Sequence, residues 1–135
     1  MKIKLILSAL VLFAVSSCTD DSGVNDATTE ELVQHKWNIK SIIDKNYLGA
    51  STTFSHYDTL EVKAGDFVDF RTDNKAYMSF DGDLDTSAYN VINDLTIKIG
   101  EDVYSINVLN DINFVLQYEE RTDTPYFDNI VHLTR

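Results

Sequence analysis

The chain has few of the residues that would crosslink a small fold or interrupt its strands. Its 135 residues include one cysteine, one proline and five glycines. With a single cysteine there is no internal disulfide, so burial of apolar side chains must stabilise the fold. Basic residues are also scarce, since 11 lysines and arginines stand against 22 acidic residues. Nucleic-acid binding depends on basic side chains that displace counterions from phosphates, so nucleic acid is excluded as a partner.

Long apolar runs are absent too, but the N-terminus carries a short one. Residues 1–4 are positively charged, and residues 5–15 form an apolar core of about eleven residues, whereas a membrane-spanning helix needs about 20. Ser16 and Ser17 are small enough to lie beside a signal-peptidase cleavage site. We therefore predict that residues 1–17 are an export signal that is removed.

Cys18 directly follows Val15-Ser16-Ser17, and this stretch resembles the lipobox of bacterial lipoproteins. The resemblance implies that Cys18 is acylated when the signal is cut off, and two or more acyl chains make a stable membrane anchor. Thr19 follows the cysteine, which in such lipoproteins favours the outer membrane. We expect an outer-membrane lipoprotein, on the periplasmic or the surface-exposed side, that contacts the lipid bilayer through acylated Cys18.

The mature chain divides into a tether and one domain. Lys2 and Lys4 leave with the signal, so nine basic and 22 acidic residues remain, a formal charge of −13. Residues 18–27 are small, polar and acidic, which indicates a lipidated cysteine followed by a flexible tether. Thr28 and Glu31 have the spacing of a capping box and predict a short helix. Residues 28–135 form a single domain with a modest core.

From residue 36 onward, apolar and polar residues alternate, as in strands that bury one face. The clearest apolar sets are Leu95/Ile97/Ile99, Tyr104/Ile106/Val108 and Phe114/Leu116/Tyr118. Turn-forming residues separate the runs. We predict strands over residues 36–44, 56–71, 75–81, 86–92, 95–99, 102–109, 112–121 and 127–134, with a turn or a bulge at Ala64-Gly65 in the second.

Eight short strands joined in sequence by tight turns favour an antiparallel meander. Closing that meander removes the edges at which sheets aggregate. We therefore predict an all-β fold, an eight-stranded antiparallel up-and-down barrel preceded by a short N-terminal helix. A two-sheet β-sandwich is the alternative architecture.

The short helical turn leading into "HKWNIKSI", the eight segments and the final "IVHLTR" resemble the small lipocalin-like lipoproteins of bacteria. In lipocalins a tryptophan begins the first strand and closes the base of the barrel, while an arginine near the end of the last strand lies across its ring. The resemblance assigns these roles to Trp37 and Arg135, and such a contact contributes about 0.5 to 2 kcal/mol. His35 stands where the family pattern has glycine, two residues before the tryptophan.

The resemblance implies that a small hydrophobic or amphipathic molecule binds in the open mouth of the barrel. A barrel of eight strands is about the size at which its own side chains fill the interior or leave room for one small ligand. The candidate contacts are the inward-facing Trp37, Ile39, Tyr104, Ile106, Phe114, Leu116 and Tyr118, and packing in an ordinary core is their alternative role.

A second function class stays open on the same fold. A filled barrel would act as an accessory or interaction protein that recognises an envelope or extracellular protein or glycan through its loops. Exposed aromatic residues such as Tyr47, Tyr57 and Phe127 would then make the contacts.

Catalysis and metal binding find little support in the sequence. The three histidines, His35, His56 and His132, are far apart and show no ligand spacing, so we predict no catalytic residues, no enzyme activity and no cofactor.

Asp81, Asp83 and Asp85 alternate as oxygen ligands would. An EF-hand loop needs glycine at position six and glutamate at position twelve, where this chain has Thr86 and Ile92. The two remaining readings are a solvated turn and a weak cation site of another kind.

Overall fold

The structure is a computed structural model that describes residues 27–49, 53–121 and 125–135. Cys18, the predicted signal and nearly all of the predicted tether lie outside the described residues. Within them, one helix precedes nine strands. The elements are α1 (Thr29–Val33), β1 (Lys36–Tyr47), β2 (Phe54–Leu60), β3 (Phe67–Phe70), β4 (Lys75–Phe80), β5 (Asp83–Asn93), β6 (Thr96–Ile99), β7 (Asp102–Leu109), β8 (Asn113–Glu120) and β9 (Phe127–Thr134).

The strands form a closed antiparallel barrel, because β1 pairs with β9 as well as with β2 and β3. From β3 to β9 each strand pairs with the next one along the chain. β2 pairs with residues 42–47 of β1 and β3 with residues 36–38, so β2 and β3 are two pieces of one barrel strand. The predicted eight-stranded barrel with a short preceding helix is thus confirmed, and the sandwich is not formed.

Residues 61–66 interrupt the predicted strand 56–71 and separate β2 from β3. Gly65 has a φ of 103°, a backbone conformation that other residues rarely adopt. Asp66 is only 4% exposed, and its carboxylate accepts the backbone N–H groups of Lys63 at 2.8 Å and Asp81 at 3.0 Å. These hydrogen bonds satisfy a buried charge and hold the interruption in place.

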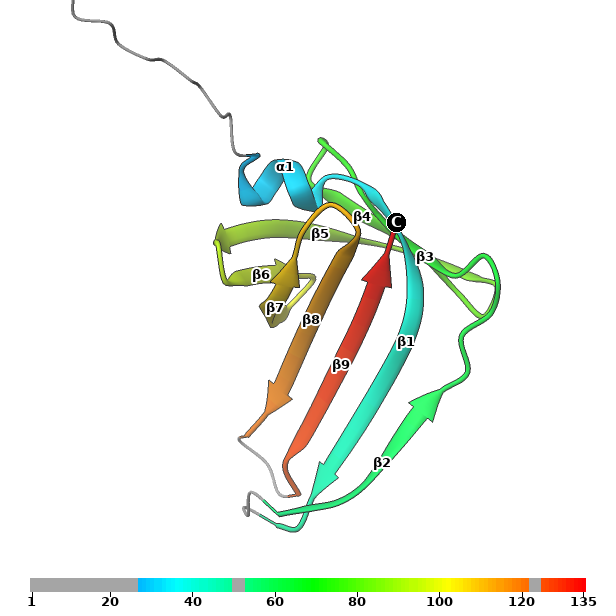
Figure 1. The fold of residues 1–135 in the computed structure, drawn as a ribbon, viewed down its shortest axis with the longest axis vertical. Coiled ribbons are helices and arrows are strands. Elements are labelled where there is room, and N and C mark those ends of the chain that lie inside the picture. Colours follow the sequence, from blue (N-terminus) through cyan, green and yellow to red (C-terminus); the bar gives the residue numbers. More distant parts are fainter. Residues whose placement is uncertain (1–26, 50–52, 122–124) are drawn as a thin grey trace, which may run out of the picture.

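Helix α1 begins with the predicted capping box. The Thr28 hydroxyl accepts the backbone N–H of Glu31 at 3.2 Å, and the Glu31 carboxylate accepts the backbone N–H of Thr28 at 2.8 Å. The helix lies across one end of the barrel (Figure 1) and buries Val33 completely. Among the described residues, no helix has the length and the apolar character that crossing a membrane requires.

The two ends of the barrel differ in construction. At the end covered by α1, hereafter the closed end, β1 begins and β9 finishes. At the other, open end, the distal parts of β2, β1, β9 and β8 continue beyond the shorter strands β3, β4 and β6 (Figure 1). In this extension β2 pairs only with β1, and residues 118–120 of β8 pair only with β9. The inner face of the extension therefore reaches solvent.

A bulge and a turn break the predicted alternation at two positions. The β7–β8 register shifts between Ile106 and Val108, so Ile106 is buried whereas Val108 is 41% exposed. An extra residue in one strand moves the next side chain to the opposite face, so the predicted inward position of Val108 is wrong. Leu95, placed with Ile97 on the apolar face, precedes β6 in the turn after Asn93 and is 70% exposed.

The predicted strand 86–92 also begins earlier, at Asp83. Asp81 and Gly82 both have positive φ, 51° and 87°, and β4 pairs directly with β5 across them, with Phe80 opposite Asp83. Two central residues with positive φ are typical of a tight hairpin turn, for which Asp-Gly is a favoured sequence. The "DGD" stretch is therefore a turn followed directly by a strand.

Candidate functional site at the open end of the barrel

The closed end is built around Trp37, the only tryptophan in the sequence. Its indole N–H donates to the carbonyl oxygen of Val33 at 3.0 Å, and its ring lies 5.4 Å from the ring of Phe114. The Arg135 guanidinium lies 4.9 Å from the Trp37 ring centroid and donates to the backbone oxygen of Asp111 at 2.5 Å. His35, two residues before the tryptophan, packs edge-on against the same indole at 6.4 Å.

Five of the seven candidate ligand contacts lie in the packed core next to this closure. Their exposed fractions range from 0 to 9%, and the five are Trp37, Ile39, Ile106, Phe114 and Leu116. Phe70 fills the space beside them, with ring centroids 5.9 Å from Phe114 and 5.0 Å from Tyr89. Side chains packed in this way contact one another, so this half of the barrel interior is filled.

The other two candidates, Tyr104 and Tyr118, lie nearer the open end and are half-buried. Their rings are 5.7 Å apart and tilted by 50°. Burial raises the pKa of Tyr104, and the pKa of Tyr118 is raised mainly by its hydrogen bond to Glu120, which accepts the phenol at 3.2 Å. Both phenols therefore stay protonated at neutral pH and act as neutral hydrogen-bonding groups.

A ring of half-buried apolar side chains lies between the filled core and the open end. On β4, β6, β7 and β9 a residue of this ring lies two positions from a buried residue nearer the closed end, as Ile97 precedes Ile99 and Leu133 follows Val131. These side chains pack against the core on one side and are partly open to solvent on the other. We call them the mouth ring: Ile42, Val62, Met78, Phe80, Ile99, Tyr104 and Val131.

Polar side chains form the rim beyond the mouth ring. On the inner face of the extension, Asn129 donates to the Asp44 carboxylate at 2.6 Å, and Asp58 lies opposite Asp44 on β2. Tyr118 and Glu120 continue the rim on β8. An apolar ring with a polar, acidic rim can accept a molecule that has an apolar body and a hydrogen-bonding head.

Next to the rim, a buried ion pair that the sequence did not reveal fixes the ends of three strands. Asp128 is 3% exposed; it accepts the Tyr47 hydroxyl at 2.6 Å and lies 2.5 Å from Arg121. The Arg121 guanidinium also lies over the rings of Tyr47 at 4.9 Å and Tyr126 at 5.3 Å. The hydrogen bond to Asp128 raises the pKa of Tyr47. The cluster ties β1, β8 and β9 together where they leave the barrel.

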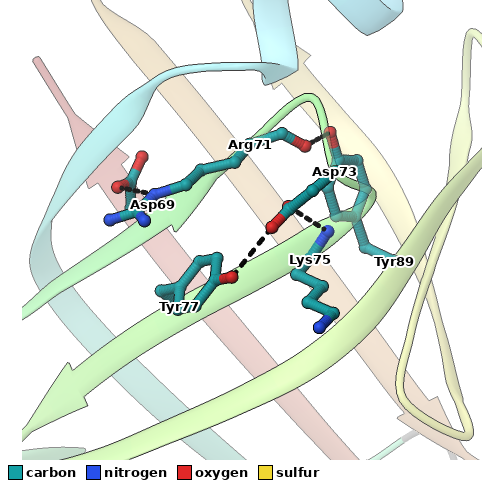
Figure 2. Close-up of polar contacts among 6 residues, drawn as sticks. All are labelled: Asp69, Arg71, Asp73, Lys75, Tyr77 and Tyr89. Carbon is teal, nitrogen blue, oxygen red and sulfur yellow. Dashed lines mark hydrogen bonds and ion pairs between the residues drawn. The ribbon is translucent and has the colours of Figure 1, made fainter.

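A second polar network lies on the outer surface of the β3–β4 hairpin (Figure 2). Arg71 pairs with Asp69 at 2.7 Å and lies 4.2 Å from the Tyr77 ring centroid. Tyr77 donates to Asp73 at 2.8 Å, which lowers the pKa of the Asp73 carboxyl. Tyr89 donates from the core to the Arg71 carbonyl at 2.9 Å. These contacts stabilise the hairpin that supplies Phe70 and Ala76 to the core.

An open depression of about 200 Å³ lies on the outer wall of the barrel, between β5 and β6. Its lining includes Ala88, Asn90, Lys98 and Gly100. Asn90 and Lys98 are cross-strand partners that face away from the buried Tyr89 and Ile97. The depression is therefore separate from the mouth ring.

The "DGDLDTS" stretch does not gather into a cation site. Asp81 pairs with Lys63, and this contact raises the pKa of the lysine. Asp83 and Asp85 lie on exposed positions of β5. Across the described ranges, no three His, Cys, Asp or Glu side chains lie close enough together to hold a metal ion.

One histidine does lie beside a serine and an aspartate, on β2. His56 is 3.4 Å from both the Ser55 hydroxyl and the Asp58 carboxylate. His56 and Asp58 are 58% and 68% exposed, and all three residues sit next to one another on a single strand. An activated nucleophile needs a base that is oriented and shielded from water, so this arrangement lacks the geometry of a catalytic triad.

Comparisons with known proteins return no match, whether to family models, to curated proteins or to solved structures.

Proposed function

We propose that this protein is a membrane-anchored, lipocalin-like lipoprotein that binds a small amphipathic molecule at the open end of its barrel. The observation that carries the proposal is the mouth ring, whose apolar side chains converge from β1, β4, β6, β7 and β9 and remain partly exposed. A small apolar body would bury these surfaces, and each Å² of apolar surface removed from water contributes about 25 cal/mol.

The filled closed end limits where the ligand binds and how large it is. Trp37, Phe70 and Phe114 fill the barrel interior next to the closed end and are at most 1% exposed. The ligand therefore enters only as far as Tyr104, and its polar head stays at the rim with Asp44, Asn129 and Tyr118. Of the residues proposed from the sequence, Tyr104 and Tyr118 remain as ligand contacts, and Ile42, Phe80, Ile99 and Val131 join them.

Titration with the neutral apolar dye Nile red tests this site. We expect saturable fluorescence enhancement in the wild-type protein and a loss of binding of at least about tenfold in Ile99→Glu, because the carboxylate would have to be desolvated beside the dye. Leu84→Glu makes the same chemical change at a position that is 79% exposed on the outer face and should bind like the wild type.

A second pair of variants changes volume instead of charge. Val131→Phe narrows the mouth ring and should weaken binding of the dye, whereas Val103→Phe adds the same bulk on the outer face of β7, where the side chain is 49% exposed. Urea unfolding of all four variants separates loss of binding from loss of fold. Equal binding by Ile99→Glu and Leu84→Glu, with both folded, would sink the proposed site.

The anchor at Cys18 is tested separately. Expression of the full chain in a bacterial host with an alkyne-labelled fatty acid should label the wild-type protein and leave Cys18→Ser unlabelled, because the thiol is the proposed point of attachment. Label retained in Cys18→Ser, or absent from the wild type, would contradict the lipoprotein assignment without affecting the mouth ring.

The alternative function, a filled barrel that recognises a protein or glycan, draws its support from the packed closed end. The two functions differ in what they require of the mouth ring. An interaction protein would bind its partner equally well when Ile99→Glu blocks the mouth, whereas a carrier would not bind its ligand.

A further inference from the structure

Strand β2 leaves one of its two edges without a strand partner in the part of the chain that the structure describes. It pairs with β1 on one side, while β3, not β2, pairs with β4. β2 runs along the outer margin of the extension (Figure 1), and residues 55–60 are all exposed. An open edge presents unpaired backbone N–H and C=O groups to any strand that fits beside it.

The sequence of β2 protects this edge only weakly, through the single inward-facing charge of Asp58. Natural edge strands are often blocked by proline, lysine or a bulge that turns the edge away. The strand Phe54–Leu60 has the sequence FSHYDTL, with neither proline nor lysine, and its only register shift against β1 lies at the Asn46/Tyr47 end. Its exposed face includes Tyr57, which is 61% exposed.

The same sequence is complementary to itself when two copies run antiparallel about Tyr57. In that register Tyr57 of one copy lies opposite Tyr57 of the other, Ser55 opposite Thr59, and His56 opposite Asp58. The two-fold symmetry repeats the last two pairs, so each of them occurs twice. Aromatic pairs, hydroxyl pairs and pairs of a basic with an acidic residue are the cross-strand combinations that stabilise antiparallel sheets. The two members of each pair point to the same face of the joined sheet: Ser55, Tyr57 and Thr59 to one face, His56 and Asp58 to the other.

The charges near Asp58 favour this register as well. Within one chain Asp58 lies directly opposite Asp44 on β1, and two acidic residues at such positions destabilise a sheet. The His56 side chain of the same chain is 3.4 Å away, two residues earlier on β2. A second copy would place another His56 directly opposite Asp58 on the open side, so each carboxylate would lie between an acidic and a basic neighbour.

We propose that β2 is a homodimer interface, in which two copies join their β2 edges antiparallel around a two-fold axis at Tyr57. Such a contact is isologous and closes on itself, so it produces a dimer and not a fibre. It leaves the mouth ring of each copy intact and does not depend on the proposed ligand. Attachment of both copies to one membrane would raise their effective concentration and favour the dimer further.

Disulfide crosslinking tests the register directly. Cys18→Ser removes the only native thiol, and single cysteines are then introduced into the full chain. Directly opposite residues have Cα atoms about 4.5 to 5.5 Å apart, within the range that a disulfide spans. Two copies of the Tyr57→Cys variant should therefore form a disulfide with each other. Ser55→Cys should crosslink only when mixed with Thr59→Cys, because two copies of residue 55 are about 13 Å apart in this register.

Asn90→Cys, exposed on β5, sets the background for random collision. Crosslinking of Tyr57→Cys no faster than that of Asn90→Cys would overturn the interface. Crosslinking of Ser55→Cys to itself, as fast as to Thr59→Cys, would overturn the register.

A charge exchange tests the pairing without a crosslink. In sedimentation experiments, His56→Asp places two acidic residues opposite each other at both ends of the interface and should weaken the dimer roughly tenfold. The exchanged variant His56→Asp/Asp58→His restores both pairs and should recover the wild-type dimer. Asn90→Asp adds the same charge elsewhere and should leave it unchanged. A wild-type protein that sediments as a monomer, or an exchanged variant that does not recover, would contradict the proposal.

Discussion

At the scale of single residues, the closed end depends on contacts to Trp37 from both ends of the domain. Val33 accepts its indole N–H, and Arg135 covers its ring. The resemblance to lipocalins predicted the contact between the tryptophan and the arginine. The structure places the Arg135 guanidinium 4.9 Å from the centroid of the ring. The contact of His35 with the indole could not be predicted, because the lipocalin pattern that the sequence resembles has glycine at that position.

Arg135→Gln removes the cation from the indole face and should lower the free energy of unfolding by about 0.5 to 2 kcal/mol. Because Trp37 is the only tryptophan, its fluorescence during urea unfolding reports the change. Lys98→Gln is the matched control, since Lys98 pairs at 3.6 Å with a Glu101 side chain that is 99% exposed and such pairs contribute little. A loss in Lys98→Gln as large as that in Arg135→Gln would refute a specific role for the contact.

The Arg121–Asp128 cluster shows what residue-level reasoning missed. The stretch "QYEERTD" looks like a charged strand end, and Tyr47 lies 81 residues away from Asp128 in the sequence. Asp128 lies in the next strand, β9, and nothing local indicates that it is only 3% exposed. Only closure of the barrel between β1 and β9 brings Tyr47 and Asp128 together. The cluster could therefore be recognised only once the pairing of the strands was known.

At the scale of elements, the alternating pattern was enough to find the strands, and local backbone geometry decided where the pattern fails. The strands at 102–109 and 127–134 have the predicted bounds. Val108 and Leu95 broke the alternation because a bulge and a turn follow from backbone register, which a list of apolar positions does not contain. The same limit hid the mouth ring, because its members on the strands alternate with outward-facing residues just as core residues do.

Two leucines test which of the apolar positions the core buries. Leu133→Ala, at a position that is 1% exposed on β9, should cost about 2 to 5 kcal/mol, because it leaves a cavity in the core. Leu95→Ala makes the same change at a side chain that is 70% exposed and should cost less than about 0.5 kcal/mol. Chemical denaturation measures both, and equal losses would contradict the assignment of Leu133 to the core and of Leu95 to the surface.

At the scale of the whole molecule, the fold suppresses the ionisation of several tyrosines. Burial raises the pKa of Tyr89 and Tyr104, and hydrogen bonds to carboxylates raise the pKa of Tyr47, Tyr77 and Tyr118. A raised pKa in the folded state means that the unfolded chain loses its phenolic protons first as the pH rises. Stability from this source is complete below the unfolded pKa of about 10 and is lost above it.

We therefore expect the free energy of unfolding to fall as the pH rises from about 9 to about 11. Tyr104→Phe should make this fall shallower, because one of the buried phenols no longer ionises on unfolding. Urea unfolding at several pH values, together with the tyrosinate absorbance of the folded protein, measures both effects. Identical slopes for the wild type and Tyr104→Phe would exclude a contribution from Tyr104.

The alternating pattern of the sequence predicts a closed barrel, and the same pattern fits a barrel filled by its own side chains and a barrel that carries a ligand. Both need inward-facing apolar residues on every strand. The distinction depends on which of those residues stay partly exposed, and that is set by the unequal lengths of strands on the two sides of the open end. Occupation of the mouth ring is therefore the central claim.

Methyl NMR spectra of the isotope-labelled protein, titrated with decanol as a small amphipathic probe, test this claim most directly. We predict saturable shifts of the Ile42, Ile99 and Val131 methyl groups, with the Leu84, Leu95 and Val103 methyl groups unchanged on the outer surface. Shifts confined to those outer methyl groups, or mouth-ring methyl groups that stay unchanged at saturating decanol, would contradict the account.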